Sequence, residues 1–156
     1  MTNISDKLND ITSRLADRRA HMGNTSDEAW QVLVAAATEA ATHSYSPYSH
    51  YAVGSAALAD DGRLVTGCNV ENASIGLTLC AECSLVSAFV ASGGGALAQI
   101  VSVNGAGEVI TPCGRCRQVL LEHGGEELEV WTPRGAITLG ALMPFSWGPE
   151  QFERAK

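Results

Sequence analysis

The sequence lacks the features of a membrane protein, an exported protein or a general nucleic-acid-binding protein. No apolar run approaches the ~20 residues that a membrane-spanning helix needs, and no signal-peptide core follows Met1. Ten basic against 17 acidic side chains leave a formal charge of −7, and such a surface repels a phosphate backbone. We therefore expect a cytoplasmic protein that binds neither membranes nor nucleic acids.

A disulfide framework is also unexpected, because the five cysteines are odd in number and no export signal is present. Reduced thiols that serve a metal or catalysis explain them better. The 156 residues, of which 46% are hydrophobic and 17% charged, have the composition of one ordinary globular domain. A chain of this length buries about 68–70% of its unfolded surface, which is enough for a sizeable core.

Residues 1–24 look like an addition to the domain proper, which we place at residues 25–156. A stripe of apolar side chains with the spacing of one helical face runs through this segment: Ile4, Leu8, Ile11 and Leu15. The acidic residues Asp6, Asp10 and Asp17 argue against a transit peptide. We expect an amphipathic helical extension that packs on the body or on a neighbouring subunit, with a frayed terminus as the alternative.

Helices and strands alternate along the rest of the chain. A capping box at Thr25-Ser26-Asp27-Glu28 begins a helix that reaches His43, and further helices are expected at Cys80–Ala91 and Cys113–His123. Strands are expected at Tyr51–Ala59, Arg63–Val70, Gln99–Val103, Leu128–Trp131 and Ala136–Leu139. The turn Asp60-Asp61-Gly62 joins the first two strands as a hairpin. This order predicts an α/β layered domain with about five strands.

Two Cys-x-x-Cys pairs dominate the chemistry of the sequence. They are Cys80-Ala81-Glu82-Cys83 and Cys113-Gly114-Arg115-Cys116, and Pro112 precedes the second. One hypothesis is a closed structural zinc site with four thiolates, as in zinc ribbons. Against it, each pair opens a predicted helix in a chain with an ample core, so the domain needs no metal to fold.

The other hypothesis is a catalytic zinc site with three thiolates and an open fourth position for water. Cys113 and Cys116 lie three residues apart on the first turn of a helix and face the same side, and Cys80 from the other helix completes the set. Glu82 would then stand beside the water as an acid/base group without binding the metal. Zinc lowers the pKa of its bound water to roughly 7, which suits hydrolytic attack.

The cysteine motifs and their surroundings resemble one enzyme family. Cys80-Ala81-Glu82 with Pro112-Cys113-x-x-Cys116 is similar to the zinc signature of the nucleoside deaminases. Three more segments narrow the resemblance to the small, homotetrameric cytidine deaminases: Tyr48-Ser49-x-Tyr51-x-Val53-Gly54, Gly67-Cys68-Asn69-Val70-Glu71-Asn72 and Cys116-Arg117-Gln118. The resemblance runs in order from about residue 27 to Trp147. It implies a three-layer αβα sandwich with a mixed five-stranded sheet.

The resemblance also implies the reaction and its central residues. Cys80, Cys113 and Cys116 would hold one zinc ion per subunit. Glu82 would move protons during the hydrolytic deamination of cytidine or 2′-deoxycytidine to uridine or deoxyuridine and ammonia. The enzyme would thereby serve pyrimidine salvage.

The resemblance assigns the substrate-binding residues as well. Asn69 and Glu71 match positions that hydrogen-bond the ribose in the family. Ala81 matches a position whose backbone meets the pyrimidine, and Tyr51 occupies one, usually Phe, that lines the base pocket. Sites in the family are built across subunit contacts, so the resemblance implies a homotetramer in which a lone protomer is inactive.

The chain departs from the family pattern beside the zinc signature. Cys83 follows Glu82 directly, where many relatives have Arg, and three thiolates leave a zinc core at −1. The partial positive charge of two helix N-termini offsets part of this charge, and we expect Arg115 or Arg117 to supply the rest through contacts behind the ligands. Cys83 itself is either a fourth ligand or, as we prefer, a small buried thiol.

Two further positions differ from the family pattern. Ile75 stands where relatives often place a Tyr that reaches a neighbouring site, and Trp147 where a C-terminal Phe is common.

Two other functions stay open. They are deamination of a related nucleoside, such as a nucleoside antibiotic, and a non-catalytic zinc module with four cysteine ligands. Glu82 between two cysteines favours an enzyme, because a structural site has no use for a carboxylate there. Asn69 and Glu71 favour a ribosyl ligand, since ribose hydroxyls offer donors and acceptors in pairs.

Overall fold

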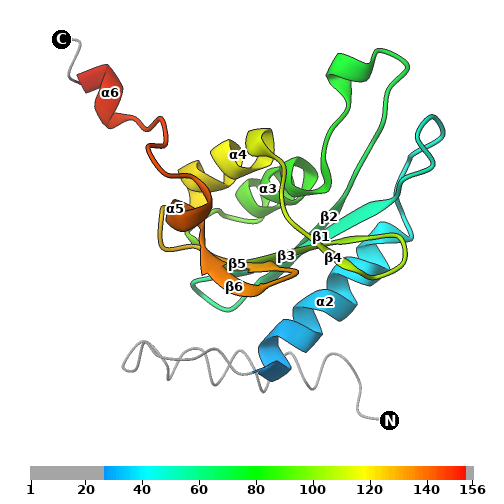
Figure 1. Cartoon of the computed structure of the whole chain (residues 1–156), viewed down its shortest axis with the longest axis horizontal. Coiled ribbons are helices and arrows are strands. Elements are labelled where there is room, and N and C mark those ends of the chain that lie inside the picture. Colours follow the sequence, from blue (N-terminus) through cyan, green and yellow to red (C-terminus); the bar gives the residue numbers. More distant parts are fainter. Residues whose placement is uncertain (1–26, 154–156) are drawn as a thin grey trace.

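A mixed β-sheet lies between helices on both of its faces (Figure 1). The computed structural model describes residues 27–153. Its helices are α2 (Asp27–Ala41), the 3₁₀ turn η1 (Ile75–Leu77), α3 (Ala81–Ala91), α4 (Gly114–Gly124), α5 (Leu139–Leu142) and α6 (Glu150–Glu153). Its strands are β1 (Val53–Ala59), β2 (Leu64–Cys68), β3 (Leu97–Asn104), β4 (Val109–Ile110), β5 (Glu129–Thr132) and β6 (Gly135–Thr138). The extension at residues 1–24 and the first half of the capping box lie outside the described residues.

The strand order is β2-β1-β3-β5-β6, with β4 paired to β3 beyond the end of β5. β1 is antiparallel to β2 and β3, β3 is parallel to β5, and β5 and β6 form an antiparallel hairpin. The predicted αβα sandwich and its mixed sheet are confirmed. The sheet has six strands rather than five, because β4 is only two residues long and so short a strand shows no alternation in the sequence.

Helix α2 covers one face of the sheet. Trp30, Leu33 and Ala37 are buried against β1 and β3, with the three- and four-residue spacing of one helical face. Gly54 on β1 allows the close approach, because a Cβ there would lie 1.9 Å from the Ala37 carbonyl oxygen. Any side chain at this position would push the helix off the sheet.

Helices α3 and α4 cover the opposite face. Their buried residues include Leu85, Phe89 and Leu120, each of which contributes about 1.5–3 kcal/mol by leaving water. Gly67 on β2 lets the start of α3 lie directly on the strand, since a Cβ there would be 2.4 Å from the Leu85 nitrogen and 2.6 Å from the Ala81 oxygen. This contact fixes the first turn of α3, which carries the zinc signature, against the sheet.

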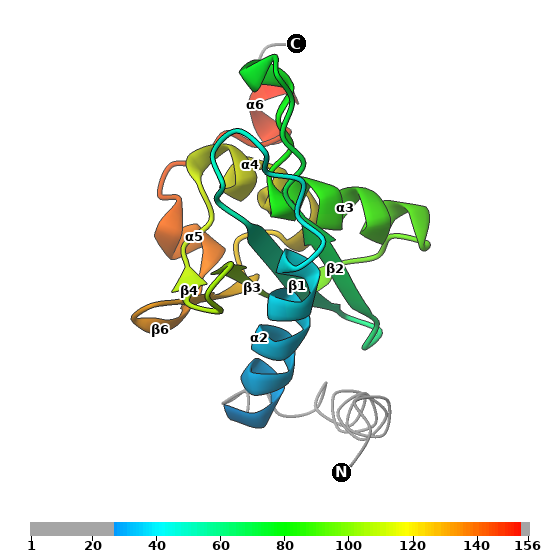
Figure 2. The ribbon, with the colours of Figure 1, turned by 90° about the vertical axis from the view of Figure 1, so that its right-hand side faces the viewer.

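Two long connections extend side by side from one end of the sheet (Figures 1 and 2). Residues 42–52 join α2 to β1, and residues 69–80 join β2 to α3. A bridge between Tyr45 and Val70 ties them together. We call them the α2–β1 loop and the β2–α3 loop. Within residues 27–153 no helix is long and apolar enough to cross a bilayer.

Candidate active site

The three cysteines of the predicted zinc site meet where α3 and α4 begin. Cys80 is the residue before α3 and Cys113 the residue before α4, and both have extended backbones. Side chains at such positions usually cap the helix, yet neither sulfur makes a capping hydrogen bond. Cys116 follows in the first turn of α4 and is fully buried. The three sulfur atoms all lie within 4.8 Å of one another.

This thiol cradle fits a zinc ion. A tetrahedral zinc with bonds of about 2.3 Å holds its sulfur ligands about 3.8 Å apart, and the Cys113 and Cys116 sulfurs are already 3.5 Å apart. Among the described residues, Cys80, Cys113 and Cys116 form the one cluster that could hold a metal, and Cys83 is not part of it. Three protein ligands leave the fourth position open, which is the arrangement of a catalytic site rather than a structural one.

The electrostatics of the cradle also call for a cation. Burial, then the nearby Glu82 carboxylate, raises the pKa of the Cys116 thiol, and burial likewise raises that of Cys80. Burial opposes ionisation of Cys113 too, but hydrogen bonds from the Cys116 N–H and the neighbouring thiols lower its pKa overall. The partial positive charge at the two helix N-termini favours thiolates. A bound divalent cation would stabilise the thiolates of Cys80 and Cys116, whose ionisation burial opposes.

Glu82 lies in the first turn of α3, 3% exposed, and faces the cradle. The Cys116 Sγ donates to its Oε2 at 3.2 Å, and the Ser102 Oγ donates to its Oε1 at 2.9 Å. The Ser55 Oγ lies 2.6 Å from the Ser102 Oγ. A serine hydroxyl has one proton to donate, so Ser55 donates to Ser102 while Ser102 donates to Glu82. One oxygen of Glu82 is thereby held from the sheet side.

Ser55 and Ser102 were not predicted as site residues; they lie opposite each other on β1 and β3 and are fully buried. A signal was available, because each serine interrupts an apolar strand. Uncharged polar side chains that are fully buried in such strands need hydrogen-bond partners. Here the partners are each other and the buried carboxylate of Glu82.

Asn69 follows β2 and is 8% exposed. Its Oδ1 accepts from the Val53 N–H at 2.8 Å and from the Ser44 hydroxyl at 2.6 Å, and its Nδ2 donates to the Tyr51 carbonyl at 2.9 Å. The structure therefore shows Asn69 holding the two ends of the α2–β1 loop.

Glu71 holds the middle of the same loop. Its Oε2 accepts from the backbone N–H groups of Tyr48, at 2.9 Å, and Ser49, at 3.2 Å, and its Oε1 accepts from the Ser49 hydroxyl. The Ser49 hydroxyl is the main reason that the pKa of Glu71 lies below its ordinary value, and the two N–H groups add to it against the effect of burial. Glu71 is thus a well-bonded carboxylate rather than a free one.

The two other predicted substrate-binding residues differ in exposure. Tyr51 is 50% exposed at the end of the α2–β1 loop, whereas Ala81 is fully buried as the first residue of α3. The N–H of a first helical residue has no partner within its helix, so the Ala81 backbone retains a donor beside the cradle.

The fold and this site agree with what comparisons with known proteins find. Residues 27–132 match the family model described as the cytidine and deoxycytidylate deaminase zinc-binding region. The chain belongs to this deaminase family. A curated cytidine deaminase of Mycobacterium tuberculosis is 55% identical over 130 residues, which make up 83% of this chain and 98% of that protein.

Solved structures lead to the same family. A crystal structure of cytidine deaminase from Mycobacterium tuberculosis is 56% identical, with a TM-score of 0.76 over 80% of this chain and 99% of that one. One from Mycobacterium leprae is 55% identical, with a TM-score of 0.73 over 74% and 97% of the two chains. This deaminase thus resembles solved cytidine deaminases in both sequence and fold.

The positions that depart from the family pattern have distinct surroundings in this deaminase. Cys83 is half-buried in the first turn of α3. Arg115 donates to the Thr78 carbonyl at 3.0 Å, and Arg117 donates to the carbonyls of Pro112 and Leu142 at 2.9 and 3.0 Å. Both guanidinium groups therefore brace backbone segments that flank the cradle.

The two substituted aromatic positions are on the surface. Ile75 is 69% exposed in η1. Trp147 is 57% exposed and stacks edge-on against Phe152, with ring centroids 5.7 Å apart. Neither residue contributes to the buried core of the protomer.

Proposed function

We propose that this protein is a zinc-dependent cytidine deaminase, which hydrolyses cytidine and 2′-deoxycytidine to uridine or deoxyuridine and ammonia. One observation carries the proposal: a three-sulfur cradle lies in hydrogen-bond contact with a buried carboxylate, Glu82. A purely structural zinc site has no use for such a carboxylate. The substrate class follows from the deaminase family to which the chain belongs.

Cys80, Cys113 and Cys116 would hold the zinc. When bound, zinc supplies a Lewis acid that makes water nucleophilic near neutral pH. Binding requires Cys116 to be a thiolate, which can no longer donate to Glu82. The Oε2 of Glu82 is then free to accept a proton, while Ser102 continues to hold Oε1 in place.

Glu82 is placed to carry protons through the whole reaction. It accepts one from the attacking water and delivers it to N3 of the cytosine ring, which makes C4 more electrophilic. The second proton of the water goes, again through Glu82, to the departing amino group. Water and cytidine are thereby converted to uridine and ammonia with no net change at the carboxylate.

Asn69 and Glu71 would bind the sugar. After their loop contacts, Asn69 retains one of its two amide N–H groups, since its Nδ2 donates only to the Tyr51 carbonyl. Glu71 accepts three bonds and retains about one acceptor site. A donor and an acceptor on neighbouring buried residues are what recognition of a ribose hydroxyl requires. Tyr51 and the Ala81 backbone would contact the base.

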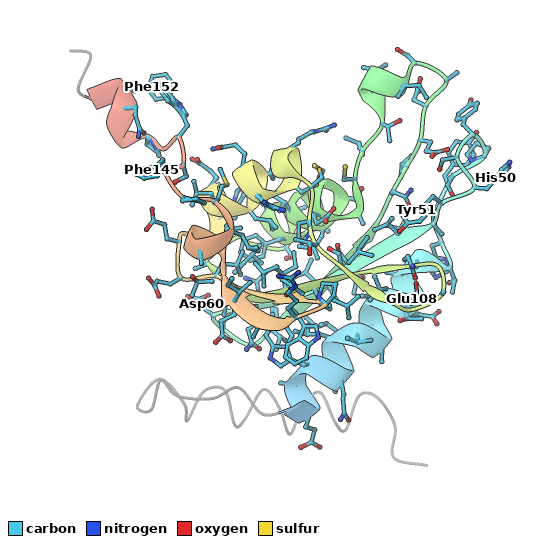
Figure 3. All side chains as sticks on the ribbon, in the orientation of Figure 1. His50, Tyr51, Asp60, Glu108, Phe145 and Phe152 are labelled. Atoms are coloured by element: carbon cyan, nitrogen blue, oxygen red, sulfur yellow. The ribbon has the colours of Figure 1, made fainter. Side chains whose placement is uncertain are left out.

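The apolar surface near the site supports a homotetramer whose sites lie at subunit interfaces. The large side chains of the two loops that are exposed in the protomer are Tyr45, Tyr48, Tyr51, Val70, Ile75, Leu77 and Leu79. Phe145 and Phe152 on the C-terminal segment also project from the body (Figure 3). Exposed apolar side chains that gather in this way mark interaction sites. A tetramer would cover this surface. The cytoplasmic location and the role in pyrimidine salvage belong to the same proposal and rest on the deaminase family to which the chain belongs.

The test is ultraviolet-monitored turnover of cytidine by the wild type and by Glu82→Gln. We expect a loss of about 10²- to 10⁴-fold in kcat, since Glu82 is the proton carrier, with zinc content unchanged. Glu122→Gln on the exposed side of α4 is the matched control and should turn over like the wild type. Equal rates for wild type and Glu82→Gln, or no turnover by the wild type, would contradict the proposal.

A further inference from the structure

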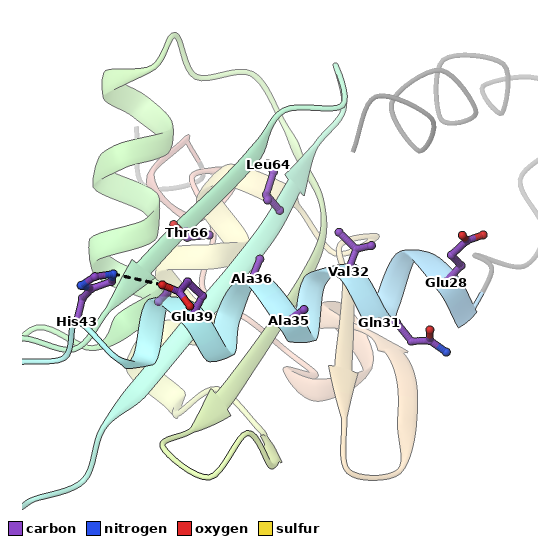
Figure 4. Close-up of a pocket in the computed structure, with 10 residues that line it drawn as sticks. Glu28, Gln31, Val32, Ala35, Ala36, Glu39, His43, Leu64 and Thr66 are labelled. Carbon is purple, nitrogen blue, oxygen red and sulfur yellow. Dashed lines mark ion pairs between the residues drawn. The ribbon is translucent and has the colours of Figure 1, made fainter. Parts of the chain in front are cut away.

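A groove of about 650 Å³ runs along α2 at the edge of the sheet (Figure 4). Its floor is apolar and includes Val32, Ala35 and Ala36 of α2 and Leu64 of β2. Its rim carries acidic side chains, among them Glu39, whose side chain is 77% exposed. The groove lies on the face of the sheet opposite α3 and α4, so it is separate from the thiol cradle.

Residues 1–26, which lead directly into α2, match this groove in chemistry. The apolar stripe Ile4, Leu8, Ile11 and Leu15 predicts a helix with one apolar face. The floor of the groove is apolar too, so the two surfaces are complementary. The segment carries four basic and three acidic side chains, whereas residues 27–156 carry six basic and 14 acidic ones. A disproportionate share of the basic groups therefore precedes an acidic domain.

The segment also has the right length. Residues 20–26 provide a connection of seven residues, within the roughly 2–8 residues typical between packed helices. In an antiparallel helix pair, residues at equal distances from the middle of the connection face each other. Lys7 and Glu39 are each 16 residues from residue 23, and Arg18 and Glu28 are each five residues from it. The same register places the apolar stripe over the groove floor.

We propose that residues 4–19 form a helix that docks in the α2 groove of its own chain, as an antiparallel helical hairpin with α2. Apolar contacts of the stripe with Val32, Ala35 and Ala36 hold it in the groove, and the pair Lys7–Glu39 sets its register. The family match begins at residue 27, so this helix is an element added to the family domain.

The chain offers an unusually clean test, because Lys7 and Lys156 are its only lysines. A zero-length carbodiimide reagent joins an amine to a carboxylate in direct contact with it. Treatment of the full-length protein, followed by proteolysis and mass spectrometry, should yield a peptide in which Lys7 is joined to Glu39. The cross-linked chain should keep the mass of a monomer on a denaturing gel.

Two variants with equal added charge separate docking from proximity. Leu8→Glu places a charge in the apolar stripe and should lower the yield of the Lys7–Glu39 peptide by about tenfold or more, because a buried charge without a partner is costly. Ser13→Glu lies on the opposite side of the same predicted helix and should leave the yield unchanged.

Three results would overturn the proposal. The first is a Lys7 cross-link between chains, which would mean that a second copy is the occupant. The second is Lys7 joined only to carboxylates outside the groove. The third is an equal yield from Leu8→Glu and Ser13→Glu. None of these readouts involves turnover, so they are independent of the deaminase assignment.

Discussion

The thiol cradle and the two loops that extend beside it differ in how far a single chain completes them. Cys116 and Glu82 are buried, and the helices that carry them are packed on the sheet by Leu85 and Leu120. The β2–α3 loop, by contrast, contains a 3₁₀ turn, η1, without a single buried residue. Leu77 within this turn is 66% exposed.

This difference separates two requirements of the enzyme. The metal and the proton carrier have to be held rigidly, and the core of the protomer does so. The walls that we propose to contact the nucleoside lie on loops whose apolar side chains have no cover within the described chain. Substitutions in the cradle should therefore abolish chemistry without changing assembly, whereas substitutions in η1 should weaken assembly first.

The largest effect is expected from removal of one ligand sulfur. Cys116→Ala should lose stoichiometric zinc, measured by mass spectrometry of the metal, and at least about 10³-fold in kcat/KM, because the metal supplies several kcal/mol of transition-state stabilisation. Cys83→Ala is the matched control and should keep both zinc and activity. Loss of zinc from Cys83→Ala instead would make the site a four-cysteine centre and close it to water.

A smaller effect is expected behind the carboxylate. Ser102→Ala removes the hydrogen bond to Glu82 Oε1 at 2.9 Å, and a bond to a charged group is worth about 1.5–3 kcal/mol. We expect kcat to fall by about 10- to 100-fold with KM little changed, since Ser102 positions the proton carrier and does not touch the substrate. Ser55→Ala should have the same direction and a smaller size. An effect on KM alone would show that the hydrogen bonds of Ser55 and Ser102 do not act through Glu82.

A still smaller effect is expected from a substitution in the β2–α3 loop. Leu77→Asp should reduce the proposed tetramer to smaller species in light scattering, because loss of an apolar contact weakens an interface by about 1–2 kcal/mol, or roughly 5- to 30-fold. Zinc content should be unaffected. Ala106→Asp adds the same charge on the exposed turn between β3 and β4 and should leave the assembly unchanged. An unchanged oligomer in Leu77→Asp would mean that η1 faces solvent in the active enzyme.

The sequence predicted the cradle better than its supports for a physical reason. Paired cysteines at the starts of two helices are local signals, so Cys80, Cys113 and Cys116 could be named as one site. The hydrogen bond between Ser55 and Ser102 depends on the pairing of β1 with β3, which joins residues 47 positions apart. No local pattern contains that register.

The fold shows the same limit. Helices with a clear apolar face and strands bounded by turn residues were predicted within a few residues of their bounds. The strand β4 was missed because two residues carry no periodicity. The loop-binding roles of Asn69 and Glu71 were missed because the course of the α2–β1 loop follows from those contacts rather than from its own sequence.

The smallest predicted effect concerns Glu71, whose contacts to Tyr48 and Ser49 can be tested through pH. Its pKa in the folded protein lies below the ordinary value of 4.5, chiefly because of the Ser49 hydroxyl. A carboxyl group with a lowered pKa stabilises the fold fully above its unfolded pKa and loses this contribution as the pH falls through its folded pKa. The difference in melting temperature between wild type and Glu71→Gln should therefore be constant above about pH 5.5 and shrink below pH 4.5. In a Ser49→Ala background the same difference should be smaller at neutral pH, since the largest contribution is gone. A difference that does not change with pH would show that Glu71 holds the loop by shape and not by charge.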